Sequence, residues 1–253
     1  MVNKMKTYEY TIQPLLLGTM KISKAYYTYL LYPLEETTIP FVMWYVKVGD
    51  RDVLIDTGAS TEVIMRHSSN RERASYKREA TFQEALDSVG ASPESIHTVI
   101  QTHLHYDHCA HTHLCKNARI LVQEAELNFA LSPHPVFSGL YESDYLREIN
   151  FTPVCGDQEV FPGIEVRLAP GHSPGTQSVF ISTAGGIVGI SGFCCTSDII
   201  NPPEKLKDHW PILTPAVHTS SLQAFDSALK TVQSADILIP IHDIAYARRK
   251  TIP

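Results

Sequence analysis

Residues 98–108 have the sequence Thr-Val-Ile-Gln-Thr-His-Leu-His-Tyr-Asp-His, and this stretch decides the fold. Its apolar beginning predicts a buried strand, so the histidines and the aspartate follow at the point where a strand ends. Two residues apart in extended backbone, His103 and His105 project to the same side and can bind one metal ion as neutral imidazoles. Asp107 and His108 continue around the turn and can reach a second ion. The stretch therefore predicts a two-metal site at a strand end.

Two more histidines follow apolar runs further along the chain. His172 lies in the segment Leu-Ala-Pro-Gly-His-Ser-Pro-Gly-Thr at 168–176, where prolines and glycines fix a tight loop. His242 follows the apolar run Ile-Leu-Ile-Pro-Ile. A single histidine after a strand is usually structural, but beside the first cluster these two supply the further ligands that two ions require. His111 and His113 fall outside the tight run and are interpreted as surface or supporting residues.

Short strands and helices alternate around these motifs. Runs of β-branched and aromatic residues predict strands at 41–48, 52–55, 98–101, 118–122, 165–168, 179–181, 187–190 and 236–241. Helical spacing of apolar residues predicts helices at 81–89, with Thr81 as the N-cap, and at 221–232. The polar segments 60–77 and 131–145 predict long surface loops. Strands and helices in this mixture favour an α/β sandwich whose sheets are covered by helices.

Composition excludes several classes of protein and favours others. The chain has 253 residues, which suits one large domain or two small ones, with 43% hydrophobic and 19% charged residues as in soluble globular proteins. A net charge of −6 argues against nucleic acid or an anionic membrane as the main partner and favours a small-molecule substrate. The N-terminal segment lacks a secretory signal pattern, so a cytoplasmic location is expected. The five cysteines are odd in number and scattered, which favours reduced thiols.

The motifs together resemble one known family. The resembling segments are Ile55-Asp56-Thr57-Gly58, the run from His103 to His108, the stretch from Pro162 to Gly175, and His242-Asp243. In order and spacing they are similar to the metallo-β-lactamase superfamily, and more narrowly to the N-acyl homoserine lactone lactonases, which take part in quorum quenching. The likeness spans nearly the whole chain, and it implies a single domain over residues 1–253 with a four-layer αββα sandwich and the site at the edge where the two sheets meet.

The resemblance also implies a ligand arrangement. It assigns His103, His105 and His172 to one ion and Asp107, His108 and His242 to the other. Asp56 is similar to a residue that lies beside the family's site, where it orients a ligand and the loop backbone without binding metal. The implied cofactor is a pair of divalent metal ions, with zinc favoured by the imidazole-rich shell and manganese or iron also compatible. The family likeness favours a homodimer.

The sequence departs from the family pattern after the strand at 187–190. The spacing from His172 assigns Gly192 to the place of the family's bridging carboxylate, and Cys195 to the place where lactonases often carry a tyrosine that contacts substrate. Two divalent ions that share a small anion repel each other, and Gly192 has no carboxylate to offset that repulsion. We therefore predict that Cys194 lies near the metals, as a thiolate ligand or as part of the wall of a solvent-bridged site.

These features favour a hydrolase that opens a lactone or another small cyclic ester with a metal-bound hydroxide as the nucleophile. Asp107 could bind metal and also pass a proton to the leaving alkoxide. We expect the substrate pocket to be walled by residues 20–32, with Tyr26 and Tyr27, and by the loop around Trp210 and His218, where His218 is a candidate substrate-binding group. A thioester hydrolase or iron-dependent oxidoreductase of the same fold remains an alternative, although a diiron centre needs more carboxylate than the sequence offers. A non-catalytic effector that keeps the metal fold is the alternative from another class.

Overall fold

The computed structural model of the chain describes residues 8–253. Its strands are β1 (Ile12–Ser23), β2 (Glu36–Val48), β3 (Arg51–Ile55), β4 (Lys77–Arg78), β5 (Ile96–Ile100), β6 (Arg119–Gln123), β7 (Phe151–Val154), β8 (Gln158–Phe161), β9 (Ile164–Leu168), β10 (Gln177–Thr183), β11 (Gly186–Ile190) and β12 (Ile237–Ile239). Its α-helices are α1 (Thr61–His67), α2 (Asn70–Ser75), α3 (Phe82–Asp87), α4 (Tyr106–Cys109), α5 (Glu124–Leu131), α6 (Ser143–Leu146), α7 (Ser197–Ile200), α8 (Glu204–Lys207), α9 (Ser221–Gln233) and α10 (Ile244–Ala247). Short 3₁₀ turns are η1 (Lys24–Tyr26), η2 (Thr112–Leu114) and η3 (Ser138–Leu140).

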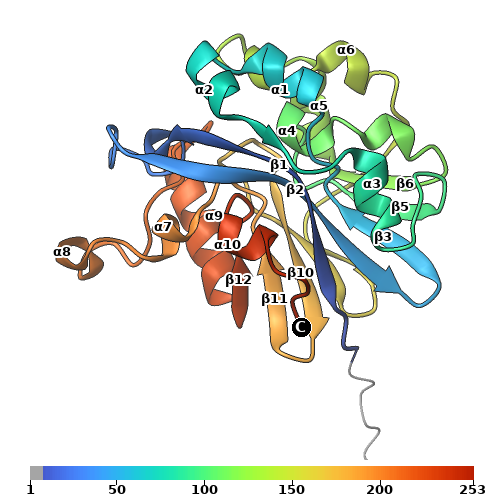
Figure 1. Cartoon of the computed structure of the whole chain (residues 1–253). Helices are drawn as coiled ribbons and strands as arrows, with labels where there is room; N and C mark the ends of the chain where they lie inside the picture. The colour runs from blue at the N-terminus through green and yellow to red at the C-terminus, as the bar shows by residue number, and fades with distance from the viewer. Residues whose placement is uncertain (1–7) are drawn as a thin grey trace, which may run out of the picture.

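Two sheets form the centre of the molecule (Figure 1). The seven-stranded sheet has the order β4-β1-β2-β3-β5-β6-β7, and the five-stranded sheet has the order β12-β11-β10-β9-β8. Their facing sides share one buried apolar core. The seven-stranded sheet contributes residues such as Val42, Trp44, Ile55, Ile100 and Leu121, and the five-stranded sheet contributes residues such as Val166, Val179, Ile181, Val188 and Ile239. Alternation along each strand puts these side chains on one face, so sheet-on-sheet packing buries them.

Helices cover the outer faces of both sheets. On the seven-stranded sheet, Phe82 and Leu86 of α3 pack with Met43 and Leu54. On the other side, α9 lies against the five-stranded sheet, where Thr231 contacts Ser178 of β10 (Figure 1). The order helix, sheet, sheet, helix confirms the expected αββα sandwich.

The topology brings the functional segments to one edge of the sandwich. Strands β3, β5 and β6 are parallel neighbours, so the segments after them emerge at the same edge. Strands β11 and β12 are also parallel, and the segments that follow them carry Cys194 and His242. Loops at the carboxyl ends of strands can carry polar side chains without disturbing the core, which is why a site can be built there.

The prediction of a long loop at 60–77 is wrong, because this segment forms α1 and α2. Ser60 caps α1, and Ser69 caps α2 in a capping box with Glu72. These caps satisfy backbone N–H groups that a short helix otherwise leaves free, and they stabilise helices whose apolar periodicity is weak. The segment 131–145 holds the last residue of α5, then η3 and the start of α6, with irregular backbone between them, so the predicted loop is only partly irregular. The long strand β1 was not predicted.

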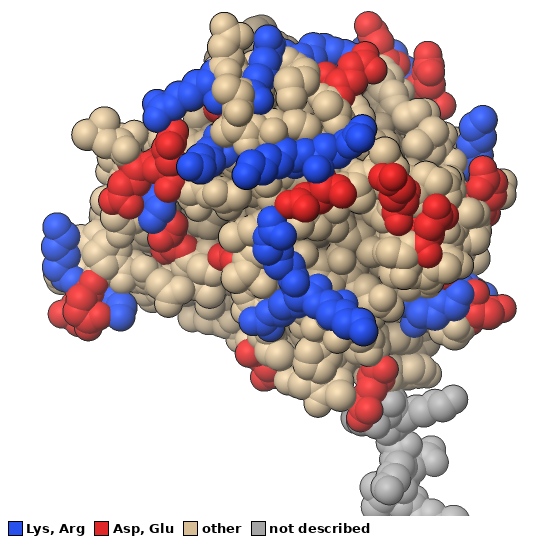
Figure 2. All heavy atoms as spheres, viewed as in Figure 1, with Lys and Arg blue, Asp and Glu red and all other residues tan. Residues whose placement is uncertain are grey.

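The surface carries charges of both signs. Figure 2 shows basic and acidic side chains interleaved on the face that it draws. Within residues 8–253, no helix is long and apolar enough to cross a membrane.

Candidate metal centre

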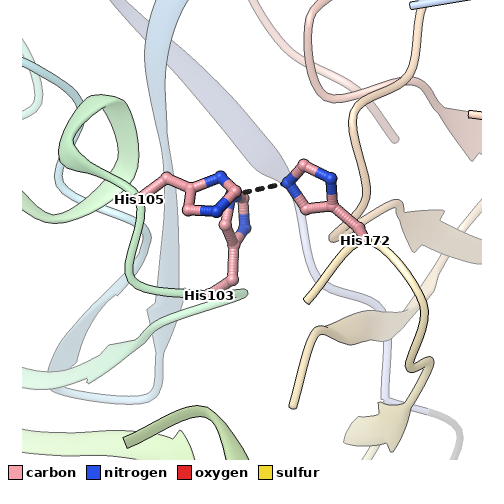
Figure 3. Close-up of side chains that lie close together, drawn as sticks. All are labelled: His103, His105 and His172. Atoms are coloured by element: carbon pink, nitrogen blue, oxygen red, sulfur yellow. Dashed lines mark hydrogen bonds between the residues drawn. The ribbon is translucent and has the colours of Figure 1, made fainter. Parts of the chain in front are cut away.

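All six residues that the family resemblance implies as ligands lie together in two groups. In each group the candidate ligand atoms lie within 4.8 Å of one another. The first group is His103, His105 and His172, and the second is Asp107, His108 and His242. Figure 3 shows the first group, with His103 and His105 on one segment and His172 reaching toward them from another. The five histidines of the two groups are buried.

The hydrogen bonds of the first group leave two nitrogen lone pairs facing each other. His172 Nδ1 lies 2.6 Å from the carbonyl of Val217, which only accepts, so Nδ1 carries the hydrogen. The Thr102 hydroxyl donates to Asp56 and must therefore accept from Nδ1 of His103, 3.0 Å away. Nε2 of both rings is then unprotonated, yet the two Nε2 atoms lie 3.2 Å apart. A cation between them accounts for this contact, which neutral imidazoles in these tautomers cannot explain by hydrogen bonding.

Burial keeps the first-group histidines and His242 unprotonated. It holds the pKa of His103 and of His105 well below the usual range, and the charges of neighbouring imidazoles add to the effect. Burial also lowers the pKa of His172 to about 4 and that of His242 to about 3. Neutral imidazole is the form that binds metal. The residues present therefore fit a divalent transition metal.

The second group combines imidazoles with a carboxylate. His108 Nδ1 lies 2.7 Å from the Asp56 carboxylate, and this contact fixes the orientation of the ring. Nε2 of His108 then lies 3.3 Å from Nε2 of His242. Oδ2 of Asp107 lies 3.5 Å from His108 Nε2 and 3.9 Å from His242 Nε2. Burial lowers the pKa of His108, but the charges of Asp107 and Asp56 outweigh it and the net shift is upward. Nδ1 of His242 has no hydrogen-bond partner within residues 8–253.

Asp56 lies beside both groups and belongs to neither. It is fully buried and has a φ of 56°, a left-handed backbone conformation that aspartate tolerates better than most residues. Its carboxylate accepts from Thr102 N at 2.7 Å and from the Thr102 hydroxyl at 2.8 Å, as well as from His108. One carboxylate thereby orients His108 directly and His103 through Thr102.

Close packing of the loop explains its two glycines. A Cβ on Gly171, whose φ is 128°, would lie 2.1 Å from the backbone of Ala224 in α9. A Cβ on Gly175 would lie 2.0 Å from the backbone nitrogen of Glu126 in α5. The loop that carries His172 is thus wedged between two helices, and only glycine fits at both contacts.

Glu126 is a site residue that the sequence analysis missed. It is fully buried, and its carboxylate accepts hydrogen bonds from Leu104 N, Tyr141 and Ser173. Acidic residues in the first turn of a helix are usually exposed and favoured by the helix dipole, so the sequence alone does not distinguish Glu126 from a surface residue. The available signal was its place four residues after the predicted strand 118–122, at the same edge as residues 102–108.

A pocket of about 250 Å³ opens over the two groups. Met20, Tyr26 and Tyr27 from the predicted N-terminal wall line it, together with Tyr106 and Val217. Tyr27 also packs edge-on against His242, with ring centroids 5.3 Å apart. The N-terminal segment therefore forms one wall of the pocket, as the sequence suggested.

The second predicted wall is wrong in its details. Trp210 lies in a different groove, with Tyr29 and Leu222. His218 does not line the 250 Å³ pocket, and its Nδ1 lies 2.7 Å from the carbonyl of Pro215. The loop contributes Val217 instead, because the hydrogen bond from His172 to the Val217 carbonyl brings that residue to the pocket.

The assignment of position 192 also needs correction. A Cβ on Gly192 would lie 1.8 Å from the carbonyl oxygen of Gln177, so this position faces the backbone of β10 and not the pocket. Cys194 lines the pocket, but it belongs to neither ligand group, and its Sγ lies 3.4 Å from the carbonyl of Tyr26. Burial raises the pKa of the Cys194 thiol well above the usual value. Cys195 packs in a separate apolar cluster with Phe193 and Ile199.

The two histidines interpreted as surface or supporting residues lie outside both groups. His111 stacks on Phe82, and its Nδ1 lies 2.8 Å from the carbonyl of Thr57. His113 is exposed and packs against Tyr145.

Sequence relatives of the chain include several lactonases. An N-acyl homoserine lactonase of Bacillus cereus is 29% identical over 57% of this chain and 59% of its own length. The N-acyl homoserine lactonase of Bacillus thuringiensis is 26% identical over 85% of each chain. The N-acyl homoserine lactonase AiiB of Agrobacterium fabrum is 27% identical over 66% of this chain and 67% of its own.

Solved structures share the fold. A mutant of Bacillus thuringiensis AiiA with N-decanoyl-L-homoserine bound at its active site superposes with a TM-score of 0.75, at 22% identity over 95% of each chain. AidC, a dizinc quorum-quenching lactonase, superposes with a TM-score of 0.70 at 15% identity, over 98% of this chain and 91% of its own. The family model of the metallo-beta-lactamase superfamily matches residues 41–238. By this match, the chain belongs to the metallo-β-lactamase superfamily.

Proposed function

We propose that the protein is a metal-dependent hydrolase that opens a lactone or a similar small cyclic ester. The observation that carries the proposal is the pair of buried ligand groups side by side at the base of one pocket. Relatives that are 26% to 29% identical and are named N-acyl homoserine lactonases support the lactone as the substrate class. We also propose a single cytoplasmic domain that acts on a small molecule, with no nucleic-acid or membrane partner, and that forms a homodimer.

Each group of residues has a proposed role. His103, His105 and His172 would hold one divalent ion, and Asp107, His108 and His242 a second. Zinc suits the imidazole-rich donor sets best, with manganese or iron as compatible alternatives. When bound, the ions supply Lewis acidity and lower the pKa of water toward neutrality.

Asp107 is proposed to accept the proton that the attacking water loses and to pass it on to the leaving alkoxide. It is the only carboxylate in either ligand group, and its side chain is 19% exposed where it lines the pocket. A carboxyl group in that position can reach both the metal ion of the second group and a substrate in the pocket. Asp56 is fully buried and does not line the pocket, so it cannot reach the substrate. Asp56 instead holds His108 and Thr102 in place.

The pocket walls favour an ester with an apolar substituent. Met20, Ile22, Tyr27 and Val217 present apolar surface above the two groups, and burying such surface contributes about 25 cal/mol per Å². His218 does not line this pocket, and its ring packs edge-on against Tyr29 with centroids 4.8 Å apart, so we propose that it supports the neighbouring loop and does not bind the substrate itself.

Elemental analysis followed by a substrate screen tests the proposal. We expect close to two transition-metal ions per chain, because six ligand-type residues exceed what one tetrahedral ion uses. The metal-loaded protein should turn over lactones faster than linear esters or thioesters of similar size. Faster thioester turnover would favour the alternative hydrolase, oxygen-dependent turnover would favour the oxidoreductase, and metal binding without any turnover would favour an effector.

Cys194 and Cys195 offer a matched pair of variants. We expect Cys194→Ser to keep both metal ions and to change KM, because the thiol lines the pocket outside both ligand groups. Cys195→Ser should leave KM unchanged, since this residue packs in the apolar cluster away from the pocket. Metal titration and steady-state kinetics of the two variants check this. Loss of one ion in Cys194→Ser alone would instead establish thiolate coordination.

A further inference from the structure

Glu126 has a set of contacts that the proposed chemistry does not use. The side chain is fully buried at the start of α5, and it belongs to neither ligand group. A buried carboxylate is costly unless hydrogen bonds satisfy it. Leu104 N donates to Oε1 at 2.9 Å, Tyr141 donates to the same oxygen at 3.3 Å, and the Ser173 hydroxyl donates to Oε2.

Each of these donors is next in sequence to a residue of the first ligand group or packs against one. Leu104 lies between His103 and His105 in the sequence, so its N–H fixes the backbone that carries both rings. Ser173 follows His172 directly. The Tyr141 ring packs edge-on against the His105 ring, with centroids 4.8 Å apart. One carboxylate therefore joins the two segments whose histidines must meet at one ion.

The packing leaves this connection little freedom to shift. The Ser173 hydroxyl also lies 2.7 Å from the hydroxyl of Thr176, which in turn accepts from Ser173 N. Gly175 lies so close to the backbone of Glu126 that no side chain fits there. Displacement of the Glu126 carboxylate would therefore move the loop that carries His172 relative to the segment that carries His103 and His105.

We propose that Glu126 is a positioning residue for the first ligand group, and that it sets the affinity of that group for its metal ion through contacts that do not include any residue of the second group. The inference rests on the proposed ligand assignment but not on lactone hydrolysis. Asp56 provides the contrast, because it contacts His108 directly and His103 through Thr102 and so serves both groups.

Metal titration of variants tests the proposal. Partners of this kind typically change metal affinity by about 10- to 100-fold. We expect Glu126→Ala to lower the affinity for one of the two metal ions by that factor and to leave the affinity for the other unchanged. Glu126→Gln should stay within a few-fold of the natural protein, because its amide oxygen can accept from Leu104 N while its NH₂ donates to Ser173, whose hydroxyl then donates to Thr176. Ser173→Ala, which removes one of the three contacts, should give an intermediate loss.

The control is Glu124→Ala, which removes an exposed carboxylate two residues earlier in the same helix. Each variant is titrated with Zn²⁺ against a chelator, and thermal unfolding of the metal-free proteins is recorded in parallel. If Glu126→Ala lowers the affinity for both ions equally, or for neither, the positioning role is wrong. If Glu126→Gln binds the first ion as weakly as Glu126→Ala does, the negative charge of Glu126 and not its positioning contacts sets the affinity. If the natural chain itself binds fewer than two ions, the ligand assignment fails first, and this outcome is separate from the failure of the Glu126 role.

Discussion

His105→Ala is expected to lower kcat/KM for a lactone by at least about a thousandfold, because metal activation is worth several kcal/mol and each 1.36 kcal/mol is tenfold in rate. The variant keeps His103 and His172, but two imidazoles hold an ion more weakly than three. His105 belongs only to the first group, so we expect one ion to be lost and the ion of the second group to remain. Metal content after dialysis and steady-state kinetics measure both effects.

The loss should occur without unfolding. His105 lies in the segment between β5 and α4, outside the apolar cores of the sheets. We expect the thermal midpoint of the metal-free variant to stay within about 4 °C of the natural protein, which corresponds to about 1 kcal/mol for a chain of this size. His209→Ala, at an exposed position after α8, is the matched control and should keep full activity and both ions. Full turnover in His105→Ala would show that the site is misassigned.

The sequence predicted the centre of this molecule well because its signals there are local. The apolar strand before His103 and the tight loop around His172 each set the direction of a few residues, and the structure brings both motifs together. The helix at 81–89 was predicted from its periodicity and its Thr81 cap, and it appears as α3 with that cap in place.

What the sequence did not predict depends on contacts between distant segments. Glu126 becomes a partner of the site only because β6 lies beside β5, so that the start of α5 meets Leu104. Position 192 was assigned by counting residues from His172, but a side chain there would meet the carbonyl oxygen of Gln177 and not the pocket. Counting along a chain assumes regular structure, and that assumption fails where a strand ends.

Helices α1 and α2 were missed for a different reason. Their apolar periodicity is weak, and only Ile64 of α1 is buried among the residues of the two helices. The signals that were present are the caps, Ser60 for α1 and the box formed by Ser69 and Glu72 for α2. Capping patterns deserve more weight than periodicity in short surface helices, because the caps there satisfy a large share of the backbone groups.

Asp107→Asn separates the two roles proposed for this residue. The amide can still offer an oxygen at the position from which Oδ2 now faces His108 and His242 at 3.5 Å and 3.9 Å, but it cannot release a proton to the substrate. General acid catalysis contributes about 10²- to 10⁴-fold, and we expect a loss of kcat in that range for an aliphatic lactone, whose alkoxide must be protonated to leave.

The leaving group distinguishes proton donation from a change in metal binding. A phenol has a pKa of about 10, so a phenolate can depart without a proton, and an aryl ester should lose far less activity in Asp107→Asn than an aliphatic lactone does. Metal content measured on the same preparations shows whether the second group is still filled. An equal loss on both substrates, with both ions retained, would mean that Asp107 does not protonate the leaving group. The proton would then have to come from another side chain of the pocket, such as Tyr27 or Tyr106, or from solvent.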